Sequence, residues 1–303
     1  MFSKKSSIIN GSRNEKKCPN FIFAIILSLV FMYGGSLIGS VVLIPIYLIL
    51  RNADLFTNNK ELLSLLVTLL SFAFISLLVF FRVKVLEKRN LLYIGFNKDN
   101  WLKKYSFGFL IGMLMMGAIV LILLPFGYIE VEKNPIQPVG ISAISSILII
   151  LIGWIIQGAT EEILTRGWLL NVLVTKYNIG FALLISSTLF GVMHLSNPNV
   201  NYIAVINIIL VGIFYGIYVI KTNDLWSVCG THSAWNFVQG NIFGFEVSGI
   251  NVSVGTLIDL NLVGNEVITG GIFGPEAGIV ATFILSISII ILLFVNKKLA
   301  LIK

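Results

Sequence analysis

The chain has 303 residues, of which 57% are hydrophobic and only 12% are charged, and its mean hydropathy is +0.95. Soluble globular domains carry about 25% charged residues, so this composition excludes a soluble domain and indicates an integral membrane protein. The formal net charge of +7 requires no nucleic-acid partner, because basic segments next to anionic membrane lipid account for it.

A membrane-spanning helix needs about 20 mostly apolar residues, and the chain contains several such runs separated by short polar joints. We predict eight transmembrane helices, near residues 20–49, 62–82, 106–127, 141–165, 179–196, 201–220, 226–244 and 277–296. Little sequence remains outside them. The fold class is therefore predicted to be all-α, a polytopic helical bundle in which residues 20–303 form one transmembrane domain behind a basic tail at residues 1–19.

The basic residues indicate how the bundle is oriented in the membrane. They are concentrated in the N-terminal tail, in the joint between the second and third helices and at the C-terminus, whereas only Arg51, Lys60 and Lys133 fall on the opposite side. Because Lys and Arg accumulate in cytoplasmic loops, we predict a multi-pass protein of the cell membrane with both termini in the cytoplasm. The joint from Gly244 to Gly278 has no Lys or Arg and is predicted to lie outside.

The fourth predicted helix carries the first chemical motif, EEILTR at residues 161–166. Residues four apart share a helix face, and Glu before Arg is the favourable order, so Glu162 and Arg166 are predicted to pair. Glu161 points about 100° away around the helix and is left to act as a general base on a water molecule. The alternative is that these charges form the solvated cytoplasmic end of the helix, with Arg166 favoured near its C-terminus.

Two further motifs place the two histidines of the chain in apolar helices. In the fifth predicted helix, Phe190 and His194 are four apart, so the aromatic ring can lie beside the imidazole. In the seventh, His232 and Asn236 share a face and supply two hydrogen-bonding groups without fixed charge, as stabilisation of an oxyanion requires. The alternatives are a capping or interfacial histidine in the first case and polar contacts between helices in the second.

Ionisable residues at bilayer depth are expensive, so three such motifs in one chain favour a functional site. We predict one shared site made of Glu161, Glu162, Arg166, His194, His232 and Asn236. The predicted helix ends place His194 near the outer end of its helix and Glu161 near the inner end of the fourth. A fourth helix that continues to about Leu173, or a short and broken fifth helix, would give them a common depth.

These residues resemble the EExxxR, FxxxH and HxxxN signature motifs of the CPBP superfamily, also called the Abi family. That superfamily groups the type II CAAX prenyl endopeptidases with bacteriocin-processing and self-immunity enzymes. The resemblance covers about residues 140–280, and segments 235–241, 247–249 and 269–276 are similar to its bacterial branch. Thr165 departs from the pattern, because many members carry an aromatic residue before the arginine.

The resemblance implies an intramembrane endopeptidase. Glu161, helped by His194, would activate the attacking water, and His232 and Asn236 would stabilise the oxyanion of the tetrahedral intermediate. The ion pair of the first motif would hold the site together. We therefore expect membrane lipid around the protein and a membrane-associated peptide or protein as substrate, either a CAAX protein or a bacteriocin or other peptide precursor, with self-immunity as one physiological role.

No cofactor is favoured at this stage. Two histidines and a glutamate could form a three-ligand zinc site, with Glu161, His194 and His232 as the candidate ligands, but there is no HExxH motif and a ligating glutamate is not free to act as the base. Two other functions stay open. A proton-coupled transporter would be expected to show a paired internal repeat, and a catalytically silent immunity or scaffold protein would share the same motifs.

Overall fold

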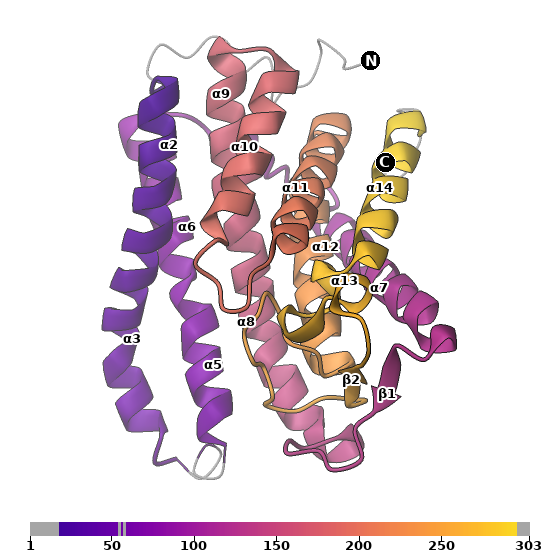
Figure 1. Cartoon of the computed structure of the whole chain (residues 1–303). Coiled ribbons are helices and arrows are strands. Elements are labelled where there is room, and N and C mark those ends of the chain that lie inside the picture. Colours follow the sequence, from indigo (N-terminus) through magenta and orange to yellow (C-terminus); the bar gives the residue numbers. More distant parts are fainter. Residues whose placement is uncertain (1–17, 54–55, 57–58, 296–303) are drawn as a thin grey trace.

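The structure of the chain is a computed structural model, and it describes residues 18–53, 56 and 59–295. It is a bundle of helices with one small two-stranded sheet at one end (Figure 1). The predicted all-α helical bundle is thus confirmed. The basic tail predicted at residues 1–19 lies almost entirely outside the described residues.

The first two predicted helices form a hairpin along one side of the bundle (Figure 1). The first combines α2 (Phe21–Leu29), a π-helical turn (Val30–Gly34) and α3 (Gly35–Leu50), and the second combines α5 (Lys60–Ser71), α6 (Ala73–Phe81) and a π-helical turn (Arg82–Leu86). Two glycines of α3 lie directly against this second helix, Gly35 at Ile75 and Gly39 at Ser71, where a Cβ atom would overlap the neighbouring backbone. Small residues of this kind let membrane helices approach closely.

The third predicted helix is α7 (Trp101–Leu123), which a 3-10 turn (Leu124–Phe126) extends. It packs along α12 (Trp226–Phe237). Gly108 of α7 lies against the Ser227 carbonyl, and Gly230 of α12 lies against the Tyr105 carbonyl. Beyond α7, strand β1 (Ile129–Val131) pairs antiparallel with β2 (Leu260–Leu262).

The fourth predicted helix is longer than the sequence indicated. Helix α8 (Ile144–Glu162) continues through a π-helical segment (Ile163–Leu169) into α9 (Leu170–Lys176), so the helical run ends at Lys176 and the predicted end at residue 165 is wrong. The prediction failed because a charged residue such as Arg166 usually marks the end of an apolar membrane segment, whereas the Arg166 side chain is fully buried. π-Helical insertions often mark functional sites.

The remaining helices complete the core of the bundle. They are α10 (Ile179–Met193), α11 (Tyr202–Thr222), α12 with a following π-helical turn (Val238–Ile242), the single turn α13 (Glu266–Thr269) and α14 (Ile279–Phe294). Helix α10 ends at Met193 rather than at the predicted residue 196, so His194 occupies its C-cap position. The start of α2 and the end of α14 lie at the same end of the bundle (Figure 1).

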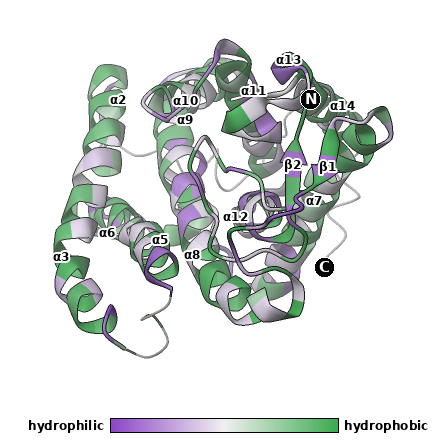
Figure 2. Cartoon of the chain, turned by 60° about the horizontal axis from the view of Figure 1, so that its bottom comes forward, coloured by the Kyte–Doolittle hydropathy of each residue, from purple (hydrophilic) through white to green (hydrophobic). Residues whose placement is uncertain are grey.

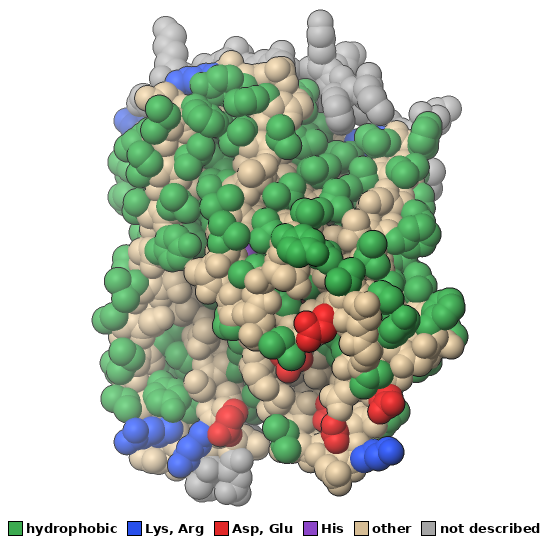
Figure 3. Space-filling view, viewed as in Figure 1, with side chains coloured by type: hydrophobic (Ala, Val, Ile, Leu, Met, Phe, Trp, Pro, Cys, Tyr) green, Lys and Arg blue, Asp and Glu red, His purple; other side chains and the backbone are tan. Residues whose placement is uncertain are grey.

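The surface of the molecule agrees with a membrane location. The helices are mostly hydrophobic, with hydrophilic patches in the loops and among the central helices (Figure 2). Apolar side chains form a broad belt, and charged side chains gather near its ends (Figure 3). Five described helices are long and apolar enough to cross a membrane, and Ile179–Met193 and Ile279–Phe294 are shorter apolar helices. The protein is thus a multi-pass membrane protein, while the count of eight crossings stays a prediction.

The long joint between α12 and α14 is packed against the bundle. Its Asp259 accepts a hydrogen bond from Gln137 Nε2 (2.9 Å), and Gln137 Oε1 accepts one from the Gly255 backbone (3.0 Å). Burial raises the pKa of Asp259, while the Gln137 hydrogen bond acts in the opposite direction. Asn241 of the π-helical turn also donates to the Gly255 carbonyl (2.9 Å). This joint is therefore held in place, and it can contribute side chains to a site inside the bundle.

We expect Gly108→Ala to lower the stability of the protein, because the added Cβ would overlap the Ser227 carbonyl at the α7–α12 contact. Overpacking of this kind costs about 1–3 kcal/mol, which corresponds to a fall in melting temperature of at least about 2 °C. Thermal unfolding in detergent would measure it. Gly117→Ala in the same helix is the matched control, because its Cβ would meet nothing within 4 Å. Equal melting temperatures for the two variants would contradict the close packing.

Candidate active site

The π-helical segment after α8 positions a buried ion pair. Arg166 Nη1 donates to Glu162 Oε1 (2.9 Å) and to the Thr165 hydroxyl (2.7 Å), and the side chains of Glu162 and Arg166 are both 0% exposed. The two residues pair as their spacing predicts. The alternative of a solvated helix end is wrong, because the helix continues for ten residues beyond Arg166, to Lys176, and the charges lie inside the bundle.

His232 of α12 also contacts the carboxylate of Glu162. Its Nδ1 lies 2.9 Å from Glu162 Oε1, and because an ionised carboxylate only accepts hydrogen bonds, we assign the proton to Nδ1. The other ring nitrogen, Nε2, then lies 3.7 Å from Glu161 Oε2. Glu162 therefore orients the imidazole of His232 towards the second glutamate.

His194 approaches Glu161 from the end of α10. Its Nδ1 lies 2.7 Å from the Phe190 carbonyl oxygen, which can only accept, so Nδ1 carries the proton here too. Its Nε2 lies 4.0 Å from Glu161 Oε2. Of the two adjustments that the sequence left open, the longer fourth helix is the one observed, because α8 continues into α9 whereas α10 is not broken before His194.

Gln157 was missed by the sequence analysis and connects two of the predicted residues. Its Nε2 donates to Glu161 Oε1 (2.7 Å), and its Oε1 accepts from Asn236 Nδ2 (2.8 Å). Glu161 Oε2, in contrast, accepts no hydrogen bond from the described residues although it is buried. The available signal was a glutamine inside an apolar helix, four residues before Glu161.

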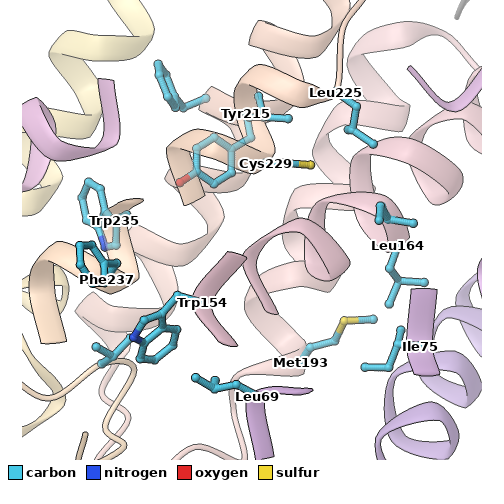
Figure 4. Packing of buried hydrophobic residues seen from close by; sticks show 14 of the residues in the cluster. Leu69, Ile75, Trp154, Leu164, Met193, Tyr215, Leu225, Cys229, Trp235 and Phe237 are labelled. Carbon is cyan, nitrogen blue, oxygen red and sulfur yellow. The ribbon is translucent and has the colours of Figure 1, made fainter. Parts of the chain in front are cut away.

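Aromatic rings enclose the charged groups. Phe190 lies edge-on to His194 (4.8 Å between ring centroids) and to His232 (6.1 Å), and Tyr215 stacks on His232 (5.6 Å). The guanidinium carbon of Arg166 lies 4.2 Å from the centre of the Phe190 ring, a favourable cation–π contact. Figure 4 shows the surrounding apolar packing, to which Tyr215 belongs. The rings restrict both imidazoles and keep the ion pair away from water.

A small, partly open cavity of about 30 Å³ lies beside this group, enough room for a water molecule. His194, His232 and Asn236 line it, and so do Ser248 and Glu276 from the joint that precedes α14. This joint was predicted to lie outside the membrane, and none of its residues was predicted to belong to the site. Glu276 was missed because nothing in its spacing connects it with residues on α8, α10 or α12.

The donor atoms can be compared with the requirements of a zinc site. Glu161, His194 and His232 offer a carboxylate oxygen and two Nε2 atoms, which are suitable ligand types. Two ligands of one tetrahedral zinc lie about 3.4 Å apart, given bonds of 2.0–2.2 Å, whereas the two nitrogen–oxygen distances here are 3.7 and 4.0 Å. Within the described residues, no group of three or more His, Cys, Asp or Glu side chains has an arrangement that could hold a metal ion.

Comparison with known proteins finds a family match for the segment that carries the site. Residues 143–238 match the family model described as type II CAAX prenyl endopeptidase Rce1-like, and this segment includes Gln157 and all six predicted site residues. The family resemblance noted in the sequence is confirmed for these residues, and it supports a CAAX-type intramembrane protease kind of function.

A curated relative matches over a longer stretch of the chain. The chain is 36% identical over 148 residues to a Bacillus subtilis (strain 168) protein named "Uncharacterized protein YyaK". The matched residues are 46% of this chain and 47% of that protein, so the chain spans about half the length of the curated relative it matches.

We expect Arg166→Met and Glu162→Gln each to destabilise the protein by about 3 kcal/mol or more, because either change leaves a buried charge without its main partner. The double variant should lose clearly less than the sum of the two single losses, since it removes both charges. Chemical or thermal unfolding in detergent would measure the cycle. Additive losses would show that the two side chains do not stabilise each other.

Proposed function

We propose that this protein is an intramembrane endopeptidase in which Glu161 activates a water molecule. The observation that supports this most directly is the environment of Glu161 Oε2, which is buried, accepts no hydrogen bond from the described residues and faces the Nε2 atoms of His194 and His232. Gln157 holds the other carboxylate oxygen. One oxygen is thus fixed, and the other is free to accept a proton.

In the proposed reaction, a water molecule donates one proton to Glu161 Oε2 and a hydrogen bond to His194 Nε2. Its oxygen attacks the carbonyl carbon of the scissile peptide bond and forms a tetrahedral intermediate. When the carbon–nitrogen bond breaks, Glu161 returns the proton to the leaving amine, so that protons balance over the cycle. No metal is required in this scheme.

His232 and Asn236 are proposed to stabilise the oxyanion. Asn236 Nδ2 uses one hydrogen on Gln157 Oε1 and keeps a second one for the substrate oxygen. Nε2 of His232 donates when the ring is protonated on both nitrogens, a form that the Glu162 carboxylate beside Nδ1 stabilises, as the aspartate of a catalytic triad does for its histidine. Arg166 fixes that carboxylate.

The substrate is proposed to be a membrane-associated peptide or protein. The matching family model is named for CAAX prenyl endopeptidases, whose substrates carry the CAAX sequence at the C-terminus. A peptide precursor, including a bacteriocin precursor, is the other class that the motifs support. We also propose that both ends of the chain face the cytoplasm. The start of α2 and the end of α14 lie at one end of the bundle (Figure 1), and Lys and Arg are concentrated in the sequence before α2 and after α14.

The test is cleavage of internally quenched peptides by purified protein in detergent. Glu161→Ala and His194→Ala should each lower kcat/KM at least about a hundredfold, because general acid–base catalysis contributes about 10²–10⁴. Glu266→Gln, on an exposed residue of the α12–α14 joint, is the control and should keep full activity. A chelator should leave the wild-type rate unchanged, and loss of activity that added zinc restores would replace the glutamate mechanism by a metal-dependent one.

Equal peptidase activity of the wild type, Glu161→Ala and His194→Ala would contradict the endopeptidase proposal. A wild type that cleaves no peptide would instead favour the catalytically silent immunity or scaffold protein, which the motifs also allow. Thermal unfolding of each variant, measured in parallel, separates loss of chemistry from loss of the fold.

Gln157→Met should reduce kcat by about tenfold to a hundredfold with little change in KM. The substitution keeps the size of the side chain but removes both hydrogen bonds that fix Glu161 and Asn236, and a small misplacement of a reacting group has an effect of this order. Steady-state kinetics with the same peptides would measure it. A rise in KM at constant kcat would show that Gln157 contributes to substrate binding instead.

A further inference from the structure

Glu276 is a carboxylate of the cavity that the proposed reaction does not use. It lies in the 3-10 turn Pro275–Ala277, directly before α14, and it lines the cavity together with His194, His232 and Ser248. It lies outside residues 143–238, the segment that matches the family model. It belongs to the α12–α14 joint and not to the helices that carry the six predicted site residues.

Both side-chain oxygens of Glu276 accept hydrogen bonds. Oε1 accepts from the Ser248 backbone N–H (2.6 Å), from Gln239 Nε2 (3.1 Å) and from the Ser248 hydroxyl (3.2 Å). Oε2 accepts from Trp235 Nε1 (3.2 Å). Indole and backbone N–H groups can only donate, so both oxygens act as acceptors and the side chain is held in one orientation.

Hydrogen bonds also hold the backbone around Glu276 in place. Asn207 Nδ2 of α11 donates to the carbonyl oxygens of Glu276 (2.8 Å) and Gly278 (2.9 Å). Asn207 Oδ1 in turn accepts from the Thr282 hydroxyl of α14 (2.7 Å). Side chain and main chain are both anchored, so Glu276 cannot turn away from the cavity without breaking several hydrogen bonds.

The negative charge of Glu276 is not balanced by a basic side chain. Among the described residues it forms no ion pair with Lys or Arg, and no Lys or Arg lines the cavity. Arg166 is bound to Glu162 and is fully buried. Glu161 adds a second carboxylate close to the two histidines that line the cavity. In such a partly buried site, charges act on one another several times more strongly than in water.

We propose that Glu276 determines substrate specificity: it favours substrates that present a cationic group to this cavity, a Lys or Arg side chain or an α-ammonium group, and it disfavours a carboxylate there. This inference rests on the proposed endopeptidase function and deepens it. A substrate whose free C-terminal carboxylate must enter the cavity fits poorly, whereas a bond within a basic peptide segment fits well.

The test uses mixtures of internally quenched peptides in which each position in turn is fixed as Lys, Gln or Glu. With the wild type in uncharged detergent, kcat/KM at one position near the cleaved bond should be about tenfold or more higher for Lys than for Glu. Glu276→Gln should reduce this ratio to less than about threefold. A residue that only holds the loop would lower the rates of all three mixtures together and leave their ratio unchanged.

Two control variants separate charge from loop anchoring. Ser248→Ala removes one hydrogen bond to Glu276 but keeps its charge, so it should keep the preference for Lys. Glu266→Gln removes an exposed charge of the same joint and should keep both the preference and the activity. Ser248→Lys places a cation beside Glu276 and should abolish the preference, which keeps the proposal testable if Glu276→Gln does not fold. If the preference for Lys persists in both Glu276→Gln and Ser248→Lys, the inference is overturned.

A binding measurement distinguishes failure of this inference from failure of the proposed function. In the Glu161→Ala protein, fluorescence anisotropy should show about tenfold tighter binding of the Lys-fixed than of the Glu-fixed peptides. If the wild type cleaves nothing but this difference is present and is lost on Glu276→Gln, the endopeptidase proposal fails and the charge selectivity of the cavity stands. Equal binding of the two mixtures overturns the inference, whatever the wild type cleaves.

Discussion

The buried carboxylate of Glu162 is the interaction on which the rest of the site depends. A charge inside a helical bundle is tolerated only when it is paired and hydrogen-bonded, and Glu162 Oε1 meets Arg166 from its own helical run and His232 from α12. The same oxygen thus joins two helices and orients an imidazole. The Phe190 ring, which contacts the Arg166 guanidinium and both histidines, adds α10 to the arrangement.

Because Glu162 is bound to Arg166 and His232, its neighbour Glu161 is the carboxylate that we propose as the general base. Glu161 lies about 100° away around the helix and faces both Nε2 atoms rather than the arginine. Gln157 occupies one of its oxygens, and the other accepts no hydrogen bond from the part of the chain that the structure describes. Two adjacent residues of one type therefore have different environments, which supports the different roles that we propose for them.

The sequence predicted what local spacing controls. Residues four apart on a helix face one another, so the pairing of Glu162 with Arg166 and the contact of Phe190 with His194 could be read directly. It did not predict the length of the fourth helix, because hydropathy treats Arg166 as exposed and cannot show that Glu162 neutralises it. Glu276 could not be predicted at all, since it reaches the cavity through an irregular joint whose path depends on tertiary hydrogen bonds.

The helical run that carries the glutamates is anchored on both sides of them. Seven residues before Glu161, Trp154 Nε1 donates to Asn241 Oδ1 (2.7 Å), and seven residues after it, Trp168 Nε1 donates to Glu87 Oε1 (3.0 Å). Trp168 itself lies in the π-helical segment, Ile163–Leu169. Trp168 also packs on Phe31 of the first hairpin (5.3 Å between ring centroids).

Reactive groups need to be held within about 0.5 Å of a productive geometry, and two indole anchors on one rigid helix meet that need better than a loop would. The hairpin outside residues 143–238 therefore has a specific part in the site, because it holds one end of the helix that positions Glu161.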